Sequence, residues 1–233
     1  MANLILIRHG QSAWNALNKF TGWVDVPLSH VGLEEAARAA EKLKAYTIDV
    51  CYTSMLIRAI QTALVCLVES DAVLQRGKCP VLHHNADDPA WHGWDAHEGN
   101  PEEEIPVFTA QALDERFYGD LQGSNKADTA AKYGDEQVRL WRRSYSVRPP
   151  GGESLEDTVA RTVPFFRERI LTHVTQGDHV LVSAHGNSLR SIIMFLEDIS
   201  ASEIPGLELA TGIPIVYDIN SQGQVTNKMI LDN

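Results

Sequence analysis

Leu4-Ile5-Leu6-Ile7-Arg8-His9-Gly10-Gln11-Ser12 is the stretch of sequence that decides the fold. Its four consecutive apolar residues predict a central strand buried on both faces, as in parallel sheets. Arg8, His9 and Gly10 follow at once, where such a strand meets a loop. A cation and an imidazole then lie at the end of the strand, next to a residue that lets the backbone approach closely. This arrangement is suited to holding a phosphate beside a nucleophile.

A second strand of the same design occurs late in the chain. Residues 179–184 form an apolar run, and His185 and Gly186 follow it directly. Apolar residues at helical spacing begin at Leu189, so we expect each His-Gly pair to lie in a turn from strand to helix. Two strands that end in the same way predict one active site with two facing imidazoles.

Strands alternate with helical patterns along the whole chain, which predicts an α/β fold with a mainly parallel sheet. Further strands are expected at 49–53 and 213–219. Pro214 interrupts the hydrogen-bond donors of the second of these, which predicts an edge position for that strand. A chain of 233 residues, 44% of them hydrophobic, is sufficient for one domain with its own core, so we expect a single domain over residues 1–233.

Apolar residues at helical spacing predict the helices around this sheet. Ser29 is expected to cap one helix and Ser54 to introduce another. Ser154 begins a capping box for a third, and Pro164 is expected to kink it. The stripe expected in the first helix consists of Leu33, Ala36, Ala37, Ala40 and Leu43.

Charge and cysteine content limit the possible partners and compartment. A net charge of −11 makes nucleic acid and anionic membranes poor partners, although 20 Lys and Arg residues leave room for a local basic pocket. Cys51, Cys66 and Cys79 are odd in number and far apart. Without a secretory signal or a long apolar run, we expect a reducing cytosolic compartment.

Residues 83–109 break the pattern of strands and helices. The segment is acidic and rich in Pro, Trp and His, and it is expected to be an exposed insertion. Its metal-binding residue types suggest a metal site, but their spacing fits no ligand motif, and no metal is expected. These residues are His83, His84, Asp87, Asp88, His92, Asp95, His97 and Glu98.

His9 is the leading candidate for a nucleophile. An imidazole with a pKa of about 6.5 is mostly neutral in the cytosol, and one nitrogen can attack phosphorus if a backbone carbonyl holds the other as a donor. His185, as a cation or a donor, could stabilise charge on the transferring phosphoryl oxygens. The alternative for each is a structural loop histidine, but Arg8 and Gly10 beside His9 favour a function there.

Phosphoryl transfer without a metal requires arginines, whose planar forks match phosphate oxygens. The candidates are Arg8, Arg58, Arg116, Arg142 and Arg143. The alternative for Arg58 is a solvated residue in a first helical turn. Glu115 could transfer a proton to or from a substrate hydroxyl if burial raises its pKa, and its alternative is a surface carboxylate paired with Arg116.

Nine blocks of sequence carry a resemblance that covers nearly the whole chain. They lie at 8–15, 20–29, 52–54 with 58–59, 115–119, 121–126, 141–143, 152–155, 184–190 and 211–214. The chain resembles the cofactor-dependent phosphoglycerate mutases of the histidine phosphatase superfamily. Arg-His-Gly by itself indicates only the superfamily, whereas Phe-Thr-Gly-Trp, Glu-Arg-x-Tyr-Gly and the double arginine together point to the mutase branch.

The resemblance implies a fold and a reaction. The fold is a three-layer sandwich with helices on both faces of the sheet. The reaction is the glycolytic and gluconeogenic interconversion of 3-phosphoglycerate and 2-phosphoglycerate. It proceeds through a phosphohistidine on His9 and a 2,3-bisphosphoglycerate intermediate, which also primes the enzyme. Glu115 is then the proton donor and acceptor, His185 the partner in the transition state and Arg8 part of the catalytic group. A cytoplasmic homodimer or homotetramer without a metal is implied.

The resemblance also implies the residues that bind substrate. They are Asn15, Thr21, Gly22, Arg58, Arg116, Tyr118, Lys126, Arg142, Arg143, Gly186 and Asn187. Two other functions stay open: a phosphatase of the same superfamily acting on small phosphomonoesters, and an inactive phosphate-binding scaffold. Lys126 and the double arginine favour the mutase, because they offer charge for a second phosphate and a carboxylate. The presence of both histidines and Glu115 argues against a scaffold.

Overall fold

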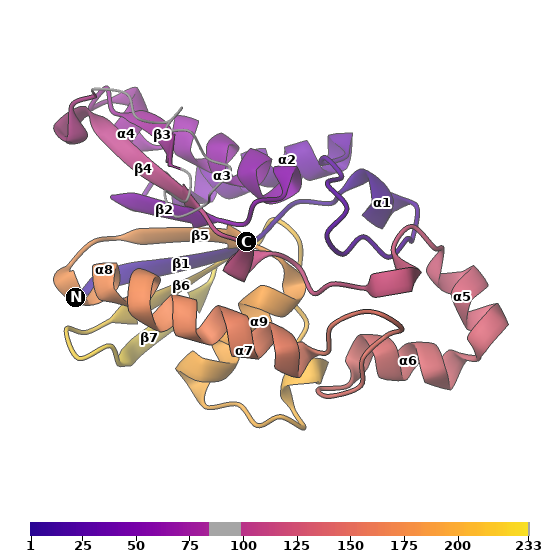
Figure 1. The fold of residues 1–233 in the computed structure, drawn as a ribbon. Coiled ribbons are helices and arrows are strands. Elements are labelled where there is room, and N and C mark those ends of the chain that lie inside the picture. The colour runs from indigo at the N-terminus through magenta and orange to yellow at the C-terminus, as the bar shows by residue number, and fades with distance from the viewer. Residues whose placement is uncertain (84–98, 233) are drawn as a thin grey trace.

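The computed structural model describes residues 1–83 and 99–232, and these residues form a seven-stranded sheet (Figure 1). The strands are β1 (Ala2–Arg8), β2 (Val50–Thr53), β3 (Cys79–His83), β4 (Glu104–Thr109), β5 (Val180–Ala184), β6 (Pro214–Ile219) and β7 (Val225–Ile230). Their order is β3-β4-β2-β5-β1-β6-β7. The first five strands in this order pair in parallel. Strand β6 pairs in the antiparallel sense with β1 on one side and with β7 on the other.

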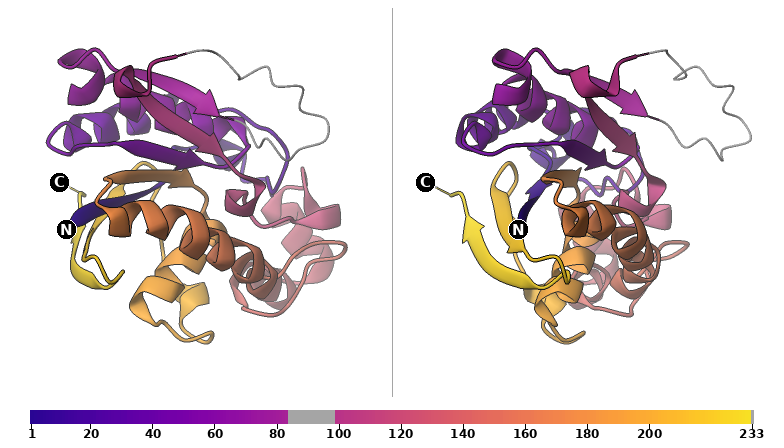
Figure 2. Two further views of the ribbon diagram at one scale, coloured as in Figure 1. Left: turned by 60° about the vertical axis from the view of Figure 1, so that its left-hand side comes forward. Right: turned by 90° about the vertical axis from the view of Figure 1, so that its left-hand side faces the viewer.

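Helices cover both faces of the sheet, as Figures 1 and 2 show. They are α1 (Ala13–Ala16), α2 (His30–Leu43), α3 (Ile57–Val68), α4 (Asp71–Leu74), α5 (Lys126–Tyr133), α6 (Asp135–Arg143), α7 (Leu155–Phe165), α8 (Leu171–Gln176) and α9 (Gly186–Glu197). Helices α2 and α3 pack on one face, and α7, α8 and α9 on the other. The prediction of a three-layer α/β fold with a mainly parallel sheet is confirmed.

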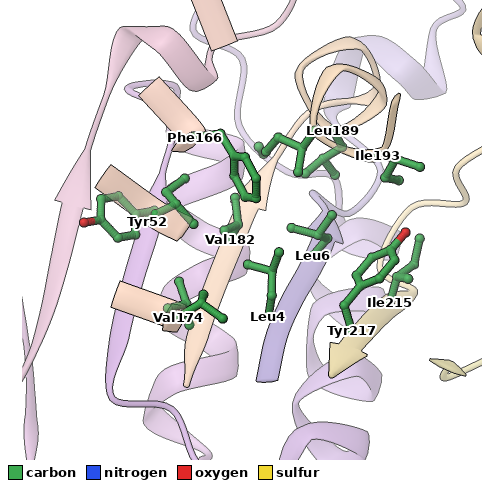
Figure 3. Close-up of a cluster of buried hydrophobic side chains, with 14 of the residues drawn as sticks. Leu4, Leu6, Tyr52, Phe166, Val174, Val182, Leu189, Ile193, Ile215 and Tyr217 are labelled. Atoms are coloured by element: carbon green, nitrogen blue, oxygen red, sulfur yellow. The ribbon is translucent and has the colours of Figure 1, made fainter. Parts of the chain in front are cut away.

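Strand β1 is central, and its side chains alternate between two cores. Leu4 and Leu6 pack in a cluster with residues of α8 and α9, part of which Figure 3 shows. Ile5 and Ile7 point to the other face and pack with residues of α2 and α3. All four side chains are buried, so the strand is apolar on both faces as expected.

Most helix boundaries follow their predicted signals. The Ser29 side chain accepts a hydrogen bond from the Gly32 N–H at the start of α2. Ser154 and Asp157 form the capping box of α7. Pro164 lies inside α7, and the backbone widens into a π-helical turn directly after this helix, at Phe166–Ile170. A departure from regular geometry is expected there, because proline has no N–H for the helix.

The buried stripe of α2 differs from the predicted one. Leu33 is 44% exposed and Ala37 is also exposed. The residues that pack inward are Gly32, Ala36, Ala39, Ala40 and Leu43. Leu33 was predicted to be buried because it is large and apolar, but small residues face inward because α2 lies very close to the turn after β1. A Cβ on Gly32 would lie 2.0 Å from the Gln11 carbonyl oxygen.

Two predictions about the sheet are wrong. Strand β6 is interior, because β7 pairs with its outer side; Pro214 is the first residue of β6, a position that tolerates a missing donor. The segment 83–109 is not wholly an exposed insertion, because Glu104–Thr109 forms β4 between β3 and β2, with Ile105 and Val107 buried. Residues 84–98, and with them most of the suggested metal ligands, lie outside the described residues.

Candidate active site

The two His-Gly turns lie side by side at the carboxyl ends of parallel strands β1 and β5. The His9 N–H donates to the Ala184 carbonyl oxygen at 3.0 Å, which ties one turn to the other. The two imidazole centroids are 4.9 Å apart and the rings are tilted by 62°. Helices α1, α5 and α6 lie beyond this end of the sheet (Figure 1). The sequence patterns therefore predicted the juxtaposition of the two imidazoles correctly.

The buried His9 is held with one nitrogen free. Its Nδ1 lies 2.7 Å from the Gly10 carbonyl oxygen, so Nδ1 carries the proton and Nε2 has the lone pair. Burial, followed by the charges of Arg58 and Arg8, holds the pKa of His9 well below its ordinary value. The imidazole is therefore neutral at physiological pH and can attack an electrophile through Nε2.

His185 is fully buried behind His9. Its Nε2 lies 2.7 Å from Ser54 Oγ, which also accepts a hydrogen bond from the Leu56 N–H. We therefore assign the Ser54 hydroxyl as the donor to Nε2 and place the imidazole proton on Nδ1. Burial, followed by the charges of Arg58 and Arg8, holds the pKa of His185 well below its ordinary value. Without a ligand, His185 is thus a neutral donor rather than a cation.

Ser54 has a different part from the one predicted. The N-cap residue of α3 is Leu56, not Ser54. The Ser54 hydroxyl accepts a hydrogen bond from the N–H of Leu56 and makes no cap bond to the helix that follows. Ser54 stands at the carboxyl end of β2, next to β5, which brings its hydroxyl to His185. In the sequence, the position of Ser54 directly after a predicted strand is the signal that could have marked it as a site residue.

Glu115 faces the cavity and is ionised. Its Oε1 accepts hydrogen bonds from the Arg116 N–H and Asn187 Nδ2, both at 2.7 Å. Burial alone would raise the pKa of Glu115, but these bonds and the charges of Arg8 and Arg116 outweigh it and lower the pKa below the ordinary value. The expectation of a raised pKa is wrong, because it omitted the donors that surround the carboxylate.

The backbone at Glu115 is fixed by two further side chains, neither of which was among the predicted site residues. Trp23 Nε1 and Arg161 Nη2 both donate to the Glu115 carbonyl oxygen, at 2.6 and 3.0 Å. Arg161 also pairs with Glu153 and donates to the carbonyl oxygen of Asp114. No motif marked Arg161, since its partners are backbone oxygens of a segment about 50 residues earlier.

Arg58 is a buried site residue and not a solvated one, since only 1% of it is exposed. Its Nη2 donates to the Gly22 carbonyl oxygen at 2.7 Å and its Nη1 to that of Val24 at 2.9 Å. Burial lowers its pKa to about 10, so it stays charged at neutral pH. Gly22 has φ +54°, and a Cβ there would lie 2.1 Å from Gln122 Oε1, so the loop that carries the predicted Thr21 and Gly22 needs a glycine.

Arg116 lies behind the side chains that face the substrate cavity and does not face it. It is fully buried, and its Nη2 donates to the Tyr118 hydroxyl at 3.0 Å and to the Arg142 carbonyl oxygen at 3.3 Å. It does not line the cavity. The structure thus makes Arg116 a support for two wall residues, whereas the sequence predicted direct contact with substrate.

A cavity opens in front of His9. It brings together most of the predicted residues: Arg8, His9, Asn15, Thr21, Gly22, Arg58, Glu115, Tyr118, Lys126, Arg142, Arg143, Gly186 and Asn187. Its wall also includes four residues that were not predicted from the sequence: Lys19, Phe20, Arg190 and Glu208. Arg190 had a signal, because it lies four residues after Gly186 on one helix.

The cavity is strongly cationic in an acidic protein. Its cations are Arg8, Lys19, Arg58, Lys126, Arg142, Arg143 and Arg190, against the carboxylates Glu115 and Glu208. Buried polar atoms without a partner among the described residues include Arg8 Nε and Thr21 Oγ1 on this wall, and His185 Nδ1, which does not line the cavity. Such unpaired donors are costly unless a ligand uses them, so the site is built for a small anion rich in oxygen atoms.

Lys126 is the cation of this wall whose charge changes most readily. It lies at the start of α5, with Nζ 5.8 Å from the centre of the Phe20 ring. Burial, followed by the charges of Arg142 and Arg8, lowers its pKa to about 8. Lys126 therefore loses part of its charge in mildly alkaline solution.

The family follows from comparison with known proteins. The model of the histidine phosphatase superfamily, branch 1, matches residues 4–76 and 96–231. The 2,3-bisphosphoglycerate-dependent phosphoglycerate mutase of Gloeothece citriformis is 61% identical, over 99% of this chain and 100% of the relative. The chain belongs to this family of mutases. A relative of the same name, with the suffix 1, from Gloeobacter violaceus is also 61% identical over the full length of both chains, and one from Protochlamydia amoebophila is 49% identical over 94% and 96%.

Solved structures outside the mutase family share the fold. A mycobacterial glucosyl-3-phosphoglycerate phosphatase with VO₃ superposes with a TM-score of 0.74 at 22% identity, covering 99% of this chain and 97% of that one. A putative alpha-ribazole-5'-P phosphatase from Escherichia coli gives 0.73 at 22% identity, over 100% and 96%. At this identity the likeness concerns the fold alone.

The described residues contain neither a cluster suited to a metal ion nor a helix suited to span a membrane. Residues 1–83 and 99–232 include no group of three or more His, Cys, Asp or Glu side chains placed to hold a metal ion. No helix in the same ranges combines the length and apolar character needed to cross a membrane.

Proposed function

We propose that the protein interconverts 3-phosphoglycerate and 2-phosphoglycerate through a phosphohistidine on His9, with 2,3-bisphosphoglycerate as intermediate and primer. The observation that carries this is the neutral His9, with Nδ1 bound to Gly10 and Nε2 free, at the wall of a cavity with seven cations. Identity with the curated mutases over the full chain supports the same reaction.

The first transfer moves the phosphoryl group from His9 to substrate. The C2 hydroxyl of 3-phosphoglycerate attacks phosphorus, so that an O–P bond forms and the N–P bond to Nε2 breaks. The Glu115 carboxylate, which is ionised before the reaction, accepts the hydroxyl proton. His9 recovers its lone pair and is neutral again.

The second transfer completes the isomerisation. The bisphosphoglycerate reorients, and Nε2 attacks the phosphorus at C3; an N–P bond forms while the C3 O–P bond breaks. Glu115 returns its proton to the C3 oxygen, which leaves 2-phosphoglycerate and the phosphoenzyme. Charge on the phosphoryl oxygens is met by His185 Nδ1–H and by Arg8 and Arg58, whose positions are fixed before reaction.

The rest of the wall has the composition needed for the other end of the substrate. Asn15 and Asn187 offer amide donors for phosphate, and Thr21, Gly22 and Tyr118 shape the side where the carboxylate lies. The cations assigned to the second phosphate and the carboxylate are Lys126, Arg142, Arg143 and Arg190. Gly186 lets the chain pass close to this group, since a Cβ there would lie 3.2 Å from Arg190 Nη1.

We further propose a cytoplasmic enzyme of glycolysis and gluconeogenesis that works as a homodimer or homotetramer without a metal. Free Cys51 and Cys66, both buried, and an exposed free Cys79 support a reducing compartment. The edge position of β3 and exposed apolar side chains on the neighbouring α3 support self-association.

Labelling with primer tests this function. The protein is incubated with ³²P-labelled 2,3-bisphosphoglycerate, and acid-labile phosphate is measured on the wild type, His9→Ala and His30→Ala. His30 is the matched control, because 88% of its side chain is exposed. Labelling is expected in the wild type and in His30→Ala and absent in His9→Ala.

The conversion of 3-phosphoglycerate is then followed with and without primer. Primer-dependent formation of 2-phosphoglycerate is expected. Release of inorganic phosphate without isomerisation would sink the mutase proposal in favour of a phosphatase. Absence of labelling would count against both enzymatic functions and in favour of the phosphate-binding scaffold.

A further inference from the structure

Three consecutive residues, Leu207 to Leu209, each hold one arginine of the cavity wall. The Leu207 carbonyl oxygen accepts from Arg190 Nε at 2.8 Å, and the Leu209 carbonyl oxygen accepts from Arg8 Nη1 at 2.8 Å. Between them, Glu208 Oε1 lies 2.7 Å from Arg143 Nη2. We call residues 207–209 the arginine strap.

The contact of Glu208 differs in kind from the other two. A carbonyl oxygen orients a guanidinium and leaves its charge available, whereas a carboxylate neutralises it. The side chain of Glu208 is 71% exposed and that of Arg143 is 35% exposed, so the pair lies where a ligand can reach it. Glu115, the other carboxylate of the wall, is held instead by the Arg116 N–H and Asn187.

We propose that Glu208 is a positioning residue that occupies Arg143 in the unliganded protein and is displaced by an anionic group of the substrate. The identity of the ligand, a phosphoglycerate, rests on the proposed function. Glu208 then lowers the affinity of the site for its ligand, because part of the attraction of Arg143 is used to release the carboxylate. This limits how tightly a highly charged intermediate is held in a cavity with seven cations.

Double-mutant analysis of binding tests this inference. The dissociation constant of 3-phosphoglycerate is measured by calorimetry, without primer, for the wild type, Glu208→Gln, Arg143→Gln and the double variant. Exposed ion pairs are weak, so Glu208→Gln is expected to tighten binding about two- to five-fold. In the Arg143→Gln background the same change is expected to have no effect. The tightening is also expected to shrink in about 0.3 M salt.

Glu203→Gln is the matched control, because it changes net charge equally in a neighbouring turn. Glu203 bonds to Ser200 and does not line the cavity. The dissociation constant of 3-phosphoglycerate for Glu203→Gln is expected to equal that for the wild type. Equal tightening by both variants, or an unchanged effect of Glu208→Gln when Arg143 is absent, would overturn the proposal.

A readout with turnover separates positioning from a structural role. Glu208→Gln is expected to lower the KM for 3-phosphoglycerate and to leave kcat at or below the wild-type value. A fall in kcat with an unchanged KM would contradict the inference. Sulfate is titrated in parallel as a plain anion. Failure of 3-phosphoglycerate to bind the wild type counts against the proposed function. The coupling between Glu208 and Arg143 is then measured from the dissociation constants of sulfate for the same four proteins.

Discussion

At the scale of single residues, Glu115 depends on its donors for its charge. Two 2.7 Å hydrogen bonds hold its Oε1, and together with the charges of Arg8 and Arg116 they outweigh the effect of burial on its pKa. Removing the carboxylate while keeping its shape isolates the proton transfer from binding. Glu115→Gln is therefore expected to lower kcat of the isomerisation about 100- to 10,000-fold, with a much smaller change in the affinity for substrate.

Steady-state kinetics and calorimetry on the same preparation check this prediction. Glu203→Gln again serves as control, and its kcat is expected to match the wild type. A Glu115→Gln enzyme with turnover within tenfold of wild type would remove Glu115 from the proton transfer.

Lys126 gives the site a dependence on pH. Its pKa of about 8 lies below the ordinary value, so the cation is present below pH 8 and is lost as pH rises through that value. An anionic substrate binds the charged form better, and we expect KM for 3-phosphoglycerate to rise above about pH 8. Lys126→Arg keeps its charge throughout this range and is expected to show no such rise.

The profile of KM between about pH 6.5 and 9.5 checks this, measured for both proteins. The same inflection in Lys126→Arg would assign the dependence to another group.

At the scale of elements, β4 shows what the sequence pattern missed. Ile105 and Val107 are buried, yet the strand follows an acidic stretch and has Pro106 between them, so the whole region looked like a surface insertion. Ile105→Ala is expected to lower the free energy of unfolding by about 2–5 kcal/mol. Leu33→Ala, on the exposed side of α2, is expected to cost less than about 1 kcal/mol.

Denaturant unfolding of the two variants beside the wild type measures both values. Equal costs would mean that Ile105 is not in the core, or that the buried side of α2 includes Leu33.

The sequence predicted elements well where one signal was sufficient. The apolar run of β1 is buried on both faces, and Ser29 and Ser154 begin their helices as expected. Predictions failed where pairing with another strand decides the outcome. Pro214 suggested an edge, and only the presence of β7, whose residues are half polar, makes β6 an interior strand.

The same distinction applies to the site. Motifs at the ends of strands identified both histidines, because that position has a fixed consequence for where a side chain lies. Glu208 and Arg161 act through contacts with segments remote in sequence, and nothing local marks them. Burial of Arg116 behind the wall likewise depends on how Tyr118 and Arg142 pack around it.

At the scale of the whole molecule, the surface beside β3 predicts association. Strand β3 is at the edge of the sheet, and exposed apolar side chains occur nearby on α3 and α4, namely Leu64, Val68 and Leu74. We expect light scattering to give twice or four times the 25.8 kDa of one chain. Val68→Glu is expected to lower the mass towards that of a monomer.

Val31→Glu, at an exposed position of α2, is the control and is expected to keep the oligomer. A monomeric wild type at about 50 μM would contradict the prediction, and dissociation by Val31→Glu alone would place the interface elsewhere.

The position of β1 in the sheet has a consequence for the order in which the protein is made. Its partners, β5 and β6, begin at residues 180 and 214. At about 5–20 residues per second, the ribosome needs roughly 10–40 s between synthesis of β1 and of these partners. During that time Leu4 to Ile7 have no strand to pair with, so we expect the nascent chain to need protection from aggregation. A ribosome-bound chain stopped at residue 178 should be cleaved near its N-terminus by protease, and the released full chain should resist. Catalytic competence would then be among the last properties the chain acquires, because the site that contains His9 is incomplete until His185 has been synthesised.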